Sequence, residues 1–444
     1  MNQSSTRRGA RNRAEHDPRT AALLIIDEVL TGKDASQAVL DKTLRSSKLV
    51  PSDKRLCTEL VYGYLRNALH LEWNVRRLLA SPQKLPAEML LVLGLAAYEL
   101  AYLSRIPSHA SVNWAVSRVH NRFGQGLAKV ANGVLRTFAR DLSGYHNASR
   151  YDIIADPLER LAVVHGVPAW IVRLWLDAYG EEATQAYLRS SSAQAVPAVR
   201  VNAFRDGAVT LRSRLVSAVG GVAVGLWGVA FPEGVPYEVR EMEKQGVVSF
   251  QSAGVQEVMA ALDAASWHGP VWDACAGRGG KTTALMELGI AVTLASDIAH
   301  TRIMQLPSEI ERLGLDGTSL AVIGGEAPLQ EAVSGRFATI LADVPCSGLG
   351  TLSRRPEIRF RRTAADIAQL CVTQDAILDA SVSRLQLGGA IIYLTCTLNP
   401  AENGERVNAF MERHPTFSLE REWQTPRETA WNEFFYGAVL RQRV

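Results

Sequence analysis

Two cysteines in the last third of the chain occupy positions where side chains often do chemistry. Cys346 follows the apolar run at 338–344, and Cys396 follows the run at 390–395. Short β-branched runs that stop at a polar or turn residue predict strands, so each thiol is expected at a strand end. Ligands of an open parallel α/β sheet bind outside the carboxyl ends of its strands. Both thiols are therefore candidate site residues, together with Asp343 beside the first.

A free cysteine is most often a small, buried packing residue. That explanation suits one isolated thiol better than two thiols at consecutive strand ends, so a chemical role is favoured. A thiol must ionise to act as a nucleophile, and nearby positive charge or a helix dipole promotes its ionisation. Lys281 is the candidate for that charge.

A glycine-rich turn follows a third predicted strand, which ends at Asp273. The turn consists of Cys275, Ala276, Gly277, Arg278, Gly279, Gly280 and Lys281. Its glycines let the backbone approach a ligand closely, and the threonines after it can help to begin a helix. A P-loop needs a glycine five positions before Gly280, where this chain has Cys275, so a nucleotide triphosphatase is disfavoured.

The three segments resemble, in order, motifs of the RNA cytosine-5 methyltransferases of the bacterial small-subunit ribosomal RNA methyltransferase B group, also called Sun or Fmu. Residues 273–282 are similar to the family's Asp-x-Cys-Ala-Ala-Pro-Gly-Gly-Lys-Thr. Residues 343–350 resemble its Asp-Ala-Pro-Cys-Ser-Gly-x-Gly. Residues 395–403 resemble its Thr-Cys-Ser followed by Pro-x-Glu-Asn. Three ordered motifs over most of the carboxy-terminal part make the resemblance specific.

The resemblance implies transfer of a methyl group from S-adenosylmethionine to carbon 5 of a cytosine in RNA, with 16S ribosomal RNA as the expected substrate. In the resembled family the Thr-Cys thiol is the nucleophile, which implies that Cys396 attacks carbon 6. Such covalent attack divides one difficult step into two easier ones. Cys346 is expected to assist proton removal and release of the product. Asp343 is expected to hydrogen-bond the activated base.

The resemblance also implies that residues at several strand ends bind the cofactor. The glycine turn is expected to wrap the methionine part, and Asp297 to accept hydrogen bonds from ribose hydroxyls, as an acidic residue does in dinucleotide folds. Glu326 is expected on the adenine side, and Asp343 also counts among the cofactor-binding residues. Gly277 and Arg278 replace the family's Ala-Pro, which removes a rigid φ and adds a charge near a cationic sulfonium. Ala299 and Asn432-Glu433 also depart from the family's pattern. Each departure is tolerable alone, and only the three together favour a reduced cofactor affinity.

Helices are predicted almost throughout the first third of the chain, because apolar residues in 19–140 recur three and four positions apart. Residues 59–66, 107–110 and 128–136 resemble the helical RNA-binding domain of the antitermination factor NusB. The sequence therefore predicts an all-α, NusB-like RNA-binding domain at 1–140.

Strand and helix alternate from Gly246 onward, which predicts a parallel, doubly wound sheet. The alternation thus predicts an α/β, Rossmann-like fold for 246–444, and the resemblance implies that this domain is a methyltransferase. A smaller connecting module is expected at 151–245. Its Arg200-Val201-Asn202 resembles a feature found ahead of the family's catalytic domain, but no role follows from its chemistry.

The net charge of +3 over 444 residues means that a nucleic-acid-binding face must come from local clusters. The basic tail at 7–13 is one, and a second consists of Arg354, Arg355, Arg359, Arg361 and Arg362. The five cysteines lack the close spacing of a zinc site, which favours reduced thiols in a cytoplasmic protein. The longest apolar run, 89–103, is shorter than the ~20 residues that span a bilayer. We expect a monomer that binds RNA and no membrane.

Two rival functions remain open at this point. In a DNA cytosine-5 methyltransferase Cys346 would be the nucleophile, but the second thiol and the helical domain argue against it. An RNA-binding ribosome assembly factor with weak or no catalysis would use the helical domain and the arginine cluster alone. The presence of Cys396, Asp343 and Lys281 makes that function the less favoured one.

Overall fold

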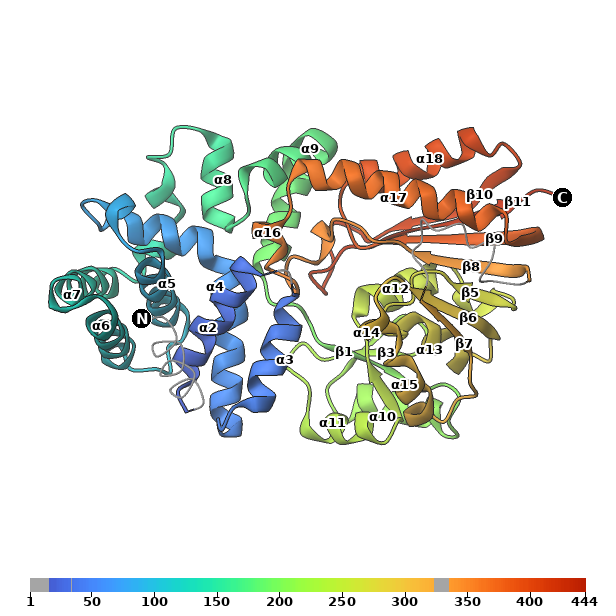
Figure 1. Cartoon of the computed structure of the whole chain (residues 1–444), viewed down its shortest axis with the longest axis horizontal. Helices are drawn as coiled ribbons and strands as arrows, with labels where there is room; N and C mark the ends of the chain where they lie inside the picture. Colours follow the sequence, from blue (N-terminus) through green and yellow to red (C-terminus); the bar gives the residue numbers. More distant parts are fainter. Residues whose placement is uncertain (1–15, 33, 323–334) are drawn as a thin grey trace, which may run out of the picture. The chain divides into compact units, whose positions relative to one another are not determined.

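The computed structural model describes residues 16–32, 34–322 and 335–444. The chain divides into two compact units (Figure 1). The first comprises Met1–Ser192 with Arg355–Arg361, and the second comprises Ala193–Arg354 with Arg362–Val444. Glu326, expected near the adenine, lies outside the described residues.

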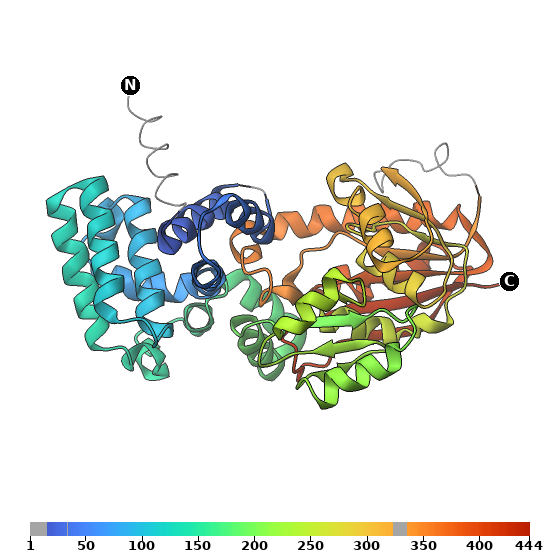
Figure 2. The ribbon, with the colours of Figure 1, turned by 90° about the horizontal axis from the view of Figure 1, so that it is seen from below.

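The first unit is built from helices around one apolar core, as the periodicity predicts. Its helices before residue 193 are α2 (Pro18–Thr31), α3 (Ser36–Ser46), α4 (Pro51–Arg77), α5 (Ala87–Tyr102), α6 (Ser108–Phe123), α7 (Gln125–Arg140), α8 (Pro157–His165) and α9 (Ala169–Ser192). Figure 2 shows α6 and α7 side by side in this bundle. A Cβ on Gly63 of α4 would lie 1.9 Å from the Tyr98 hydroxyl oxygen of α5, so glycine there allows the two helices to pack closely.

The helical unit extends beyond the expected domain boundary at 140. Trp175 of α9 is fully buried, and α8 and α9 belong to this unit rather than to a separate module. Residues 355–361, with the short helix α16 (Ile358–Arg361), also pack within it. The helical unit is therefore assembled from two separate parts of the sequence.

The arginine cluster expected to face nucleic acid is in large part structural. The Arg359 guanidinium is buried and donates to the backbone carbonyls of Arg66, Gly166 and Ser191. Arg361 donates to a backbone carbonyl of α2. Charge runs usually lie on solvated faces, but these two side chains instead satisfy carbonyl groups of the helical unit.

The second unit begins with a small antiparallel sheet in the order β2-β3-β1-β4. Its strands are β1 (Ala198–Val201), β2 (Val222–Val224), β3 (Gly228–Ala230) and β4 (Val248–Phe250), accompanied by α10 (Ala208–Ser217) and α11 (Tyr237–Lys244). The sheet thus lies within 193–250, in the part of the chain where a connecting module is expected.

The larger sheet has seven strands in the order β10-β11-β9-β8-β5-β6-β7. They are β5 (Val271–Asp273), β6 (Val292–Asp297), β7 (Ser319–Val322), β8 (Phe337–Asp343), β9 (Leu385–Thr395), β10 (Phe417–Gln424) and β11 (Tyr436–Gln442). The five from β9 to β7 are parallel, and β11 and β10 extend the sheet antiparallel. The expected parallel α/β sheet is confirmed, with an antiparallel edge.

Helices cover both faces of this sheet (Figure 1). They are α12 (Ala253–Ala261), α13 (Gly280–Glu287), α14 (His300–Ile303), α15 (Leu306–Leu313), α17 (Ala364–Val382) and α18 (Gly404–Arg413). Ile391 and Tyr393 of β9 pack in the core beneath α17 and α18, whereas Ile392 and Leu394 pack in the core beneath α12 and α13. Successive residues of a strand point to opposite faces, so β9 is apolar on both.

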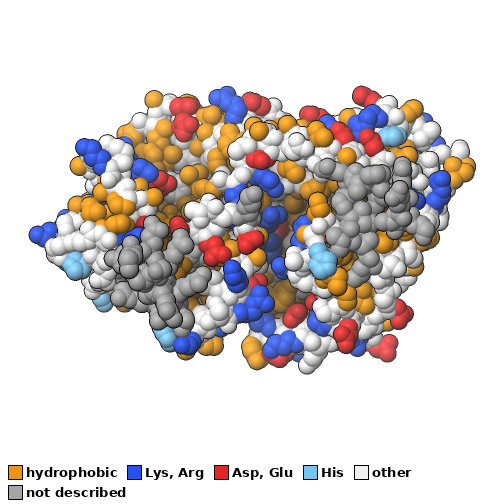
Figure 3. All heavy atoms as spheres, in the orientation of Figure 1, with side chains coloured by type: hydrophobic (Ala, Val, Ile, Leu, Met, Phe, Trp, Pro, Cys, Tyr) orange, Lys and Arg blue, Asp and Glu red, His pale blue; other side chains and the backbone are white. Residues whose placement is uncertain are grey.

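Basic and acidic side chains are interspersed on the face shown in Figure 3, in keeping with the small net charge. Within the described ranges, no single helix is both long and apolar enough to cross a membrane.

Candidate active site

The carboxyl ends of four neighbouring parallel strands bring the predicted site residues together. Asp273 of β5 stands opposite Leu341 of β8, and Asp343 of β8 stands opposite Leu394 of β9. Because these strands are adjacent and parallel, the residues that follow them meet at one edge of the sheet. The glycine turn, Asp297, Asp343 and both thiols all lie there.

The two thiols are direct neighbours. The Sγ atoms of Cys346 and Cys396 lie 3.3 Å apart, and the backbone N–H of Cys396 donates to the Cys346 sulfur at 3.3 Å. The hydrogen bond to Cys396, together with burial, holds the pKa of the Cys346 thiol well above its ordinary value. Cys346 is therefore a protonated thiol at neutral pH, next to the sulfur of Cys396.

A largely buried cation interacts electrostatically with one of these thiols. The Lys281 ammonium lies 2.5 Å from Oδ2 of Asp343. Burial on its own lowers the pKa of Lys281, but the Asp343 carboxylate more than reverses this and leaves that pKa raised. The Cys396 sulfur adds to the increase, so the ammonium and this thiol interact electrostatically. The predicted charge for thiol ionisation is thus close to Cys396.

Asp273 at the end of β5 is fully buried, and burial raises its pKa to about 7. Thr282 donates its hydroxyl to Oδ2 at 2.7 Å. The other oxygen, Oδ1, has no hydrogen-bond partner within the described part of the chain. Cys275, two residues on, is half-buried, and burial raises its thiol pKa too. A thiol that stays protonated is a poor nucleophile, so the two thiols of Cys346 and Cys396 remain the candidates for that role.

The glycine turn leaves open space beside its backbone. Gly277 has a φ of 59°, and a Cβ added there or at Gly280 would meet no described residue within 4 Å. Gly279 differs, because a Cβ there would lie 2.3 Å from a methyl carbon of Leu306. The turn thus presents bare backbone on one side, as close approach by a ligand requires, and packs on the other. The charge of Arg278 is exposed to solvent, where water and salt screen it.

Asp297 holds the turn itself. Its Oδ2 accepts the backbone N–H of Gly277 at 2.9 Å, and its Oδ1 accepts that of Ala299 at 2.7 Å. Arg302 pairs with Oδ1 at 3.0 Å. The carboxylate expected to bind ribose therefore also fixes the shape of the glycine turn.

Sequence reasoning missed Glu402 as a functional residue. This fully buried carboxylate accepts the backbone N–H of Ser347 at 2.7 Å and amide N–H groups of Gln374 and Asn399, each at 3.1 Å. Ser347 follows Cys346, whereas Asn399 follows Cys396. Glu402 therefore holds the two thiol-bearing loops against each other.

Asn403 reinforces the same arrangement by accepting from the Thr395 hydroxyl at 2.6 Å and donating to the Thr397 carbonyl at 3.0 Å. The signal for both residues was the Pro-x-Glu-Asn motif. That motif indicated the family resemblance but gave no role to Glu402, because the burial of a carboxylate cannot be recognised from sequence spacing alone. Of the arginine cluster, Arg362 donates to the Ser347 carbonyl at 3.3 Å and so also supports the thiol loop.

Comparison with known proteins identifies the families that two parts of the chain match. Residues 260–438 match the family described as 16S rRNA methyltransferase RsmB/F, and residues 16–140 match the NusB family. Ribosomal RNA small subunit methyltransferase B of Vibrio cholerae is 31% identical over 88% of this chain and 90% of its own length. The enzyme of that name from Escherichia coli is 31% identical over 82% and 83%.

Solved structures share the fold. The crystal structure of PH0851 superposes with a TM-score of 0.71 at 20% identity, covering 96% of this chain and 99% of that one. That of NSun6 from Pyrococcus horikoshii with SFG has a TM-score of 0.53 at 17% identity, covering 62% and 98%. The expected α/β methyltransferase fold and the NusB-like domain are confirmed, and the matching methyltransferase family confirms S-adenosylmethionine as cofactor. The chain belongs to the 16S rRNA methyltransferase RsmB/F family.

Proposed function

We propose that this protein methylates carbon 5 of a cytosine in small-subunit ribosomal RNA through a covalent adduct with Cys396. The observation that carries the proposal is the pair of thiols 3.3 Å apart at the ends of adjacent strands. A second thiol next to the nucleophile suits a reaction that must both form and release a covalent intermediate.

S-adenosylmethionine supplies an electrophilic methyl group when bound. The residues proposed to hold it are those of the turn from Cys275 to Lys281, with Asp297. Their fit rests on two features of the described residues: the open space beside Gly277 and Gly280, and the buried Asp273 oxygen that has no hydrogen-bond partner among them. Asp297 is proposed to bind ribose hydroxyls with the lone pairs left by its backbone contacts.

Cys396 acts first. Its thiolate attacks carbon 6 of the cytosine, and the electron pair of the 5,6 double bond moves toward carbon 5, which becomes nucleophilic. Lys281 stabilises the thiolate before the attack. Asp343 is one-third exposed and accepts a hydrogen bond from the cytosine amino group, which holds the base against the thiol.

Cys346 acts after the methyl group has been transferred. Once the Cys396 sulfur is bonded to carbon 6 it carries no negative charge, so one cause of the raised pKa of Cys346 disappears. The Cys346 thiol then loses its proton to solvent, and the resulting thiolate takes the proton from carbon 5. The electron pair of that C–H bond re-forms the double bond, and Cys396 leaves as a thiolate.

The NusB-like helical unit is proposed to bind RNA. An enzyme of this kind works in the cytoplasm, where ribosomal RNA matures, and we propose that it acts as a monomer.

The experiment that tests this function is incubation with labelled S-adenosylmethionine and either naked small-subunit ribosomal RNA or partly assembled particles, followed by mapping of the modified base. The proposal predicts one 5-methylcytosine. Label on another base, or binding of RNA without any transfer, would contradict it and favour an assembly factor.

A further inference from the structure

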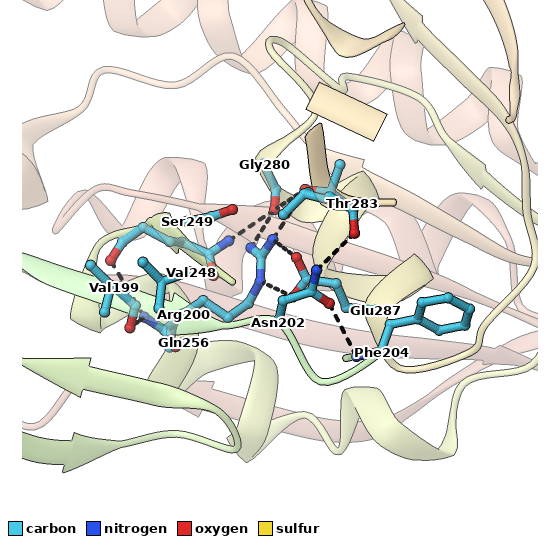
Figure 4. A network of polar contacts seen from close by, with 12 residues as sticks. Val199, Arg200, Asn202, Phe204, Val248, Ser249, Gln256, Gly280, Thr283 and Glu287 are labelled. Carbon is cyan, nitrogen blue, oxygen red and sulfur yellow. Dashed lines mark hydrogen bonds and ion pairs between the residues drawn. The ribbon is translucent and has the colours of Figure 1, made fainter. Parts of the chain in front are cut away.

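Behind the glycine turn, a buried arginine links the small antiparallel sheet to helix α13. Arg200 of β1 is 5% exposed, and Glu287 at the end of α13 is 3% exposed. The guanidinium of Arg200 donates to both carboxylate oxygens of Glu287, at 2.7 and 2.8 Å. It also donates to the Gly280 carbonyl at 2.9 Å and the Thr283 hydroxyl at 3.1 Å (Figure 4). One side chain thus contacts both ends of the helix.

Helix α13 lies between this arginine and the candidate active site. Gly280, Thr283 and Glu287 are spaced three and four residues apart, so they share the face of the helix that meets Arg200. Lys281 and Thr282 bond instead to Asp343 and Asp273 at the strand ends. Any movement of Gly280 would therefore displace the turn before it and Lys281 after it.

Two residues that follow strands of the small sheet also contact the helices on either side of the turn. Gln251, just after β4, donates to the same Gly280 carbonyl at 3.0 Å. Asn202, just after β1, donates to the Leu313 carbonyl at the end of α15 at 3.0 Å. Helix α15 begins at Leu306, which packs against Gly279. The sheet thus contacts the two helices that adjoin the turn.

Stability alone does not account for this arrangement. Removing a buried ion pair from water costs about as much as the pair gains, and apolar pairs of similar volume often serve as well. What an arginine adds is a planar set of donors with fixed geometry. That geometry matters here because Gly277, Gly279 and Gly280 give the turn many backbone conformations in the absence of outside contacts.

We propose that Arg200 is a positioning residue for S-adenosylmethionine, because it holds the Gly277–Gly280 turn in its binding conformation before the cofactor arrives. The inference rests on the proposed role of that turn in cofactor binding. It also gives the small antiparallel sheet, β1 to β4, a function, namely support of the cofactor turn. A turn that is ordered in advance loses less entropy on binding, so its removal should act on cofactor affinity first.

The test measures S-adenosylmethionine binding to the full-length chain by calorimetry. Arg200→Ala is expected to weaken the cofactor by about tenfold or more, since it removes several charge-assisted hydrogen bonds. The KM for the cofactor should rise while kcat at saturating cofactor and the affinity for RNA change little. Arg200→Lys should recover part of the affinity. Arg214→Ala is the matched control, because that arginine lies in the same module and forms an exposed ion pair with Glu238.

A purely structural role predicts a different pattern, with a lower Tm but unchanged cofactor affinity at temperatures where the variant is folded. Should Arg200→Ala fail to fold, Gln251→Ala decides, because that residue is half-buried and contacts the same carbonyl. It is expected to weaken binding about threefold, the effect of one ordinary hydrogen bond. Unchanged cofactor affinity in both Gln251→Ala and Arg200→Lys would overturn the positioning role of Arg200. It would leave the cofactor role of the turn intact. Absence of binding by the unaltered protein would overturn the cofactor role of the turn as well.

Discussion

The ammonium of Lys281 and the carboxylate of Asp343 form an ion pair at 2.5 Å between the glycine turn and the strand that leads to Cys346. One side chain follows β5 and the other ends β8, so the pair joins the proposed cofactor turn to the proposed thiol site. A substitution at either position should affect both cofactor binding and the thiol site.

Lys281→Met removes the positive charge near Cys396 while keeping the length of the side chain. Methyl transfer under single-turnover conditions should fall about 100-fold near neutral pH, a typical effect of losing a group that activates a nucleophile. Raising the pH should restore part of the rate, because the thiol then ionises even without the neighbouring positive charge. Lys244→Met is the control, since Lys244 pairs with Glu241 on the surface. An equal loss at every pH would show that Lys281 does not promote thiol ionisation.

Asp273 should make the protein less stable as the pH rises. Burial raises its pKa from an ordinary 3.8 to about 7, so between these values the folded state holds a proton that the unfolded state has lost. Stability therefore decreases through that window and levels off above it. At about 1.4 kcal/mol per unit of pKa the whole effect is at most roughly 4 kcal/mol.

Asp273→Asn removes this titration and keeps the acceptor for Thr282. Thermal unfolding should show that the variant loses less stability than the unaltered protein between about pH 4 and pH 7. Asp316→Asn, at an exposed position, should behave like the unaltered protein. Identical pH dependence of all three would mean that Asp273 is already ionised in the fold.

Glu402→Gln should separate the two thiol loops. The substitution places an amide N–H group where the carboxylate now accepts from Ser347, Gln374 and Asn399, so at least one buried donor loses its partner. We expect a loss of about 1–3 kcal/mol in the free energy of unfolding. Methyl transfer should decrease even at temperatures where the variant is folded. Glu405→Gln, an exposed neighbour, is the control, and equal activity of the two variants would contradict a positioning role for Glu402.

The elements that carry Cys346 and Cys396 could be predicted from the sequence because their signals are local. Alternating or β-branched runs predict strands, and parallel strands put the residues after them at one edge. The role of Arg359 could not be predicted in this way. Its carbonyl partners in Arg66, Gly166 and Ser191 lie 293, 193 and 168 residues away in sequence, and nothing near Arg359 indicates burial.

The same distant contacts change how the helical unit can be removed. Deleting residues 1–140 alone would take away the Arg66 carbonyl and leave the buried guanidinium of Arg359 with one partner fewer. A test of RNA binding by deletion therefore has to treat Met1–Ser192 and Arg355–Arg361 as one unit. The extent of α8 and α9 and the buried Arg200–Glu287 pair likewise depend on contacts that no short sequence pattern encodes.

The most direct test of the account is to trap the enzyme on its RNA with each thiol removed in turn. Cys346→Ala and Cys396→Ala are incubated with small-subunit ribosomal RNA and S-adenosylmethionine, and the products are separated on a denaturing gel. If Cys396 attacks carbon 6 and Cys346 serves release, the Cys346 variant accumulates a covalent RNA adduct and the Cys396 variant forms none, although both lose turnover. An adduct in Cys396→Ala but not in Cys346→Ala would contradict the account and make Cys346 the nucleophile.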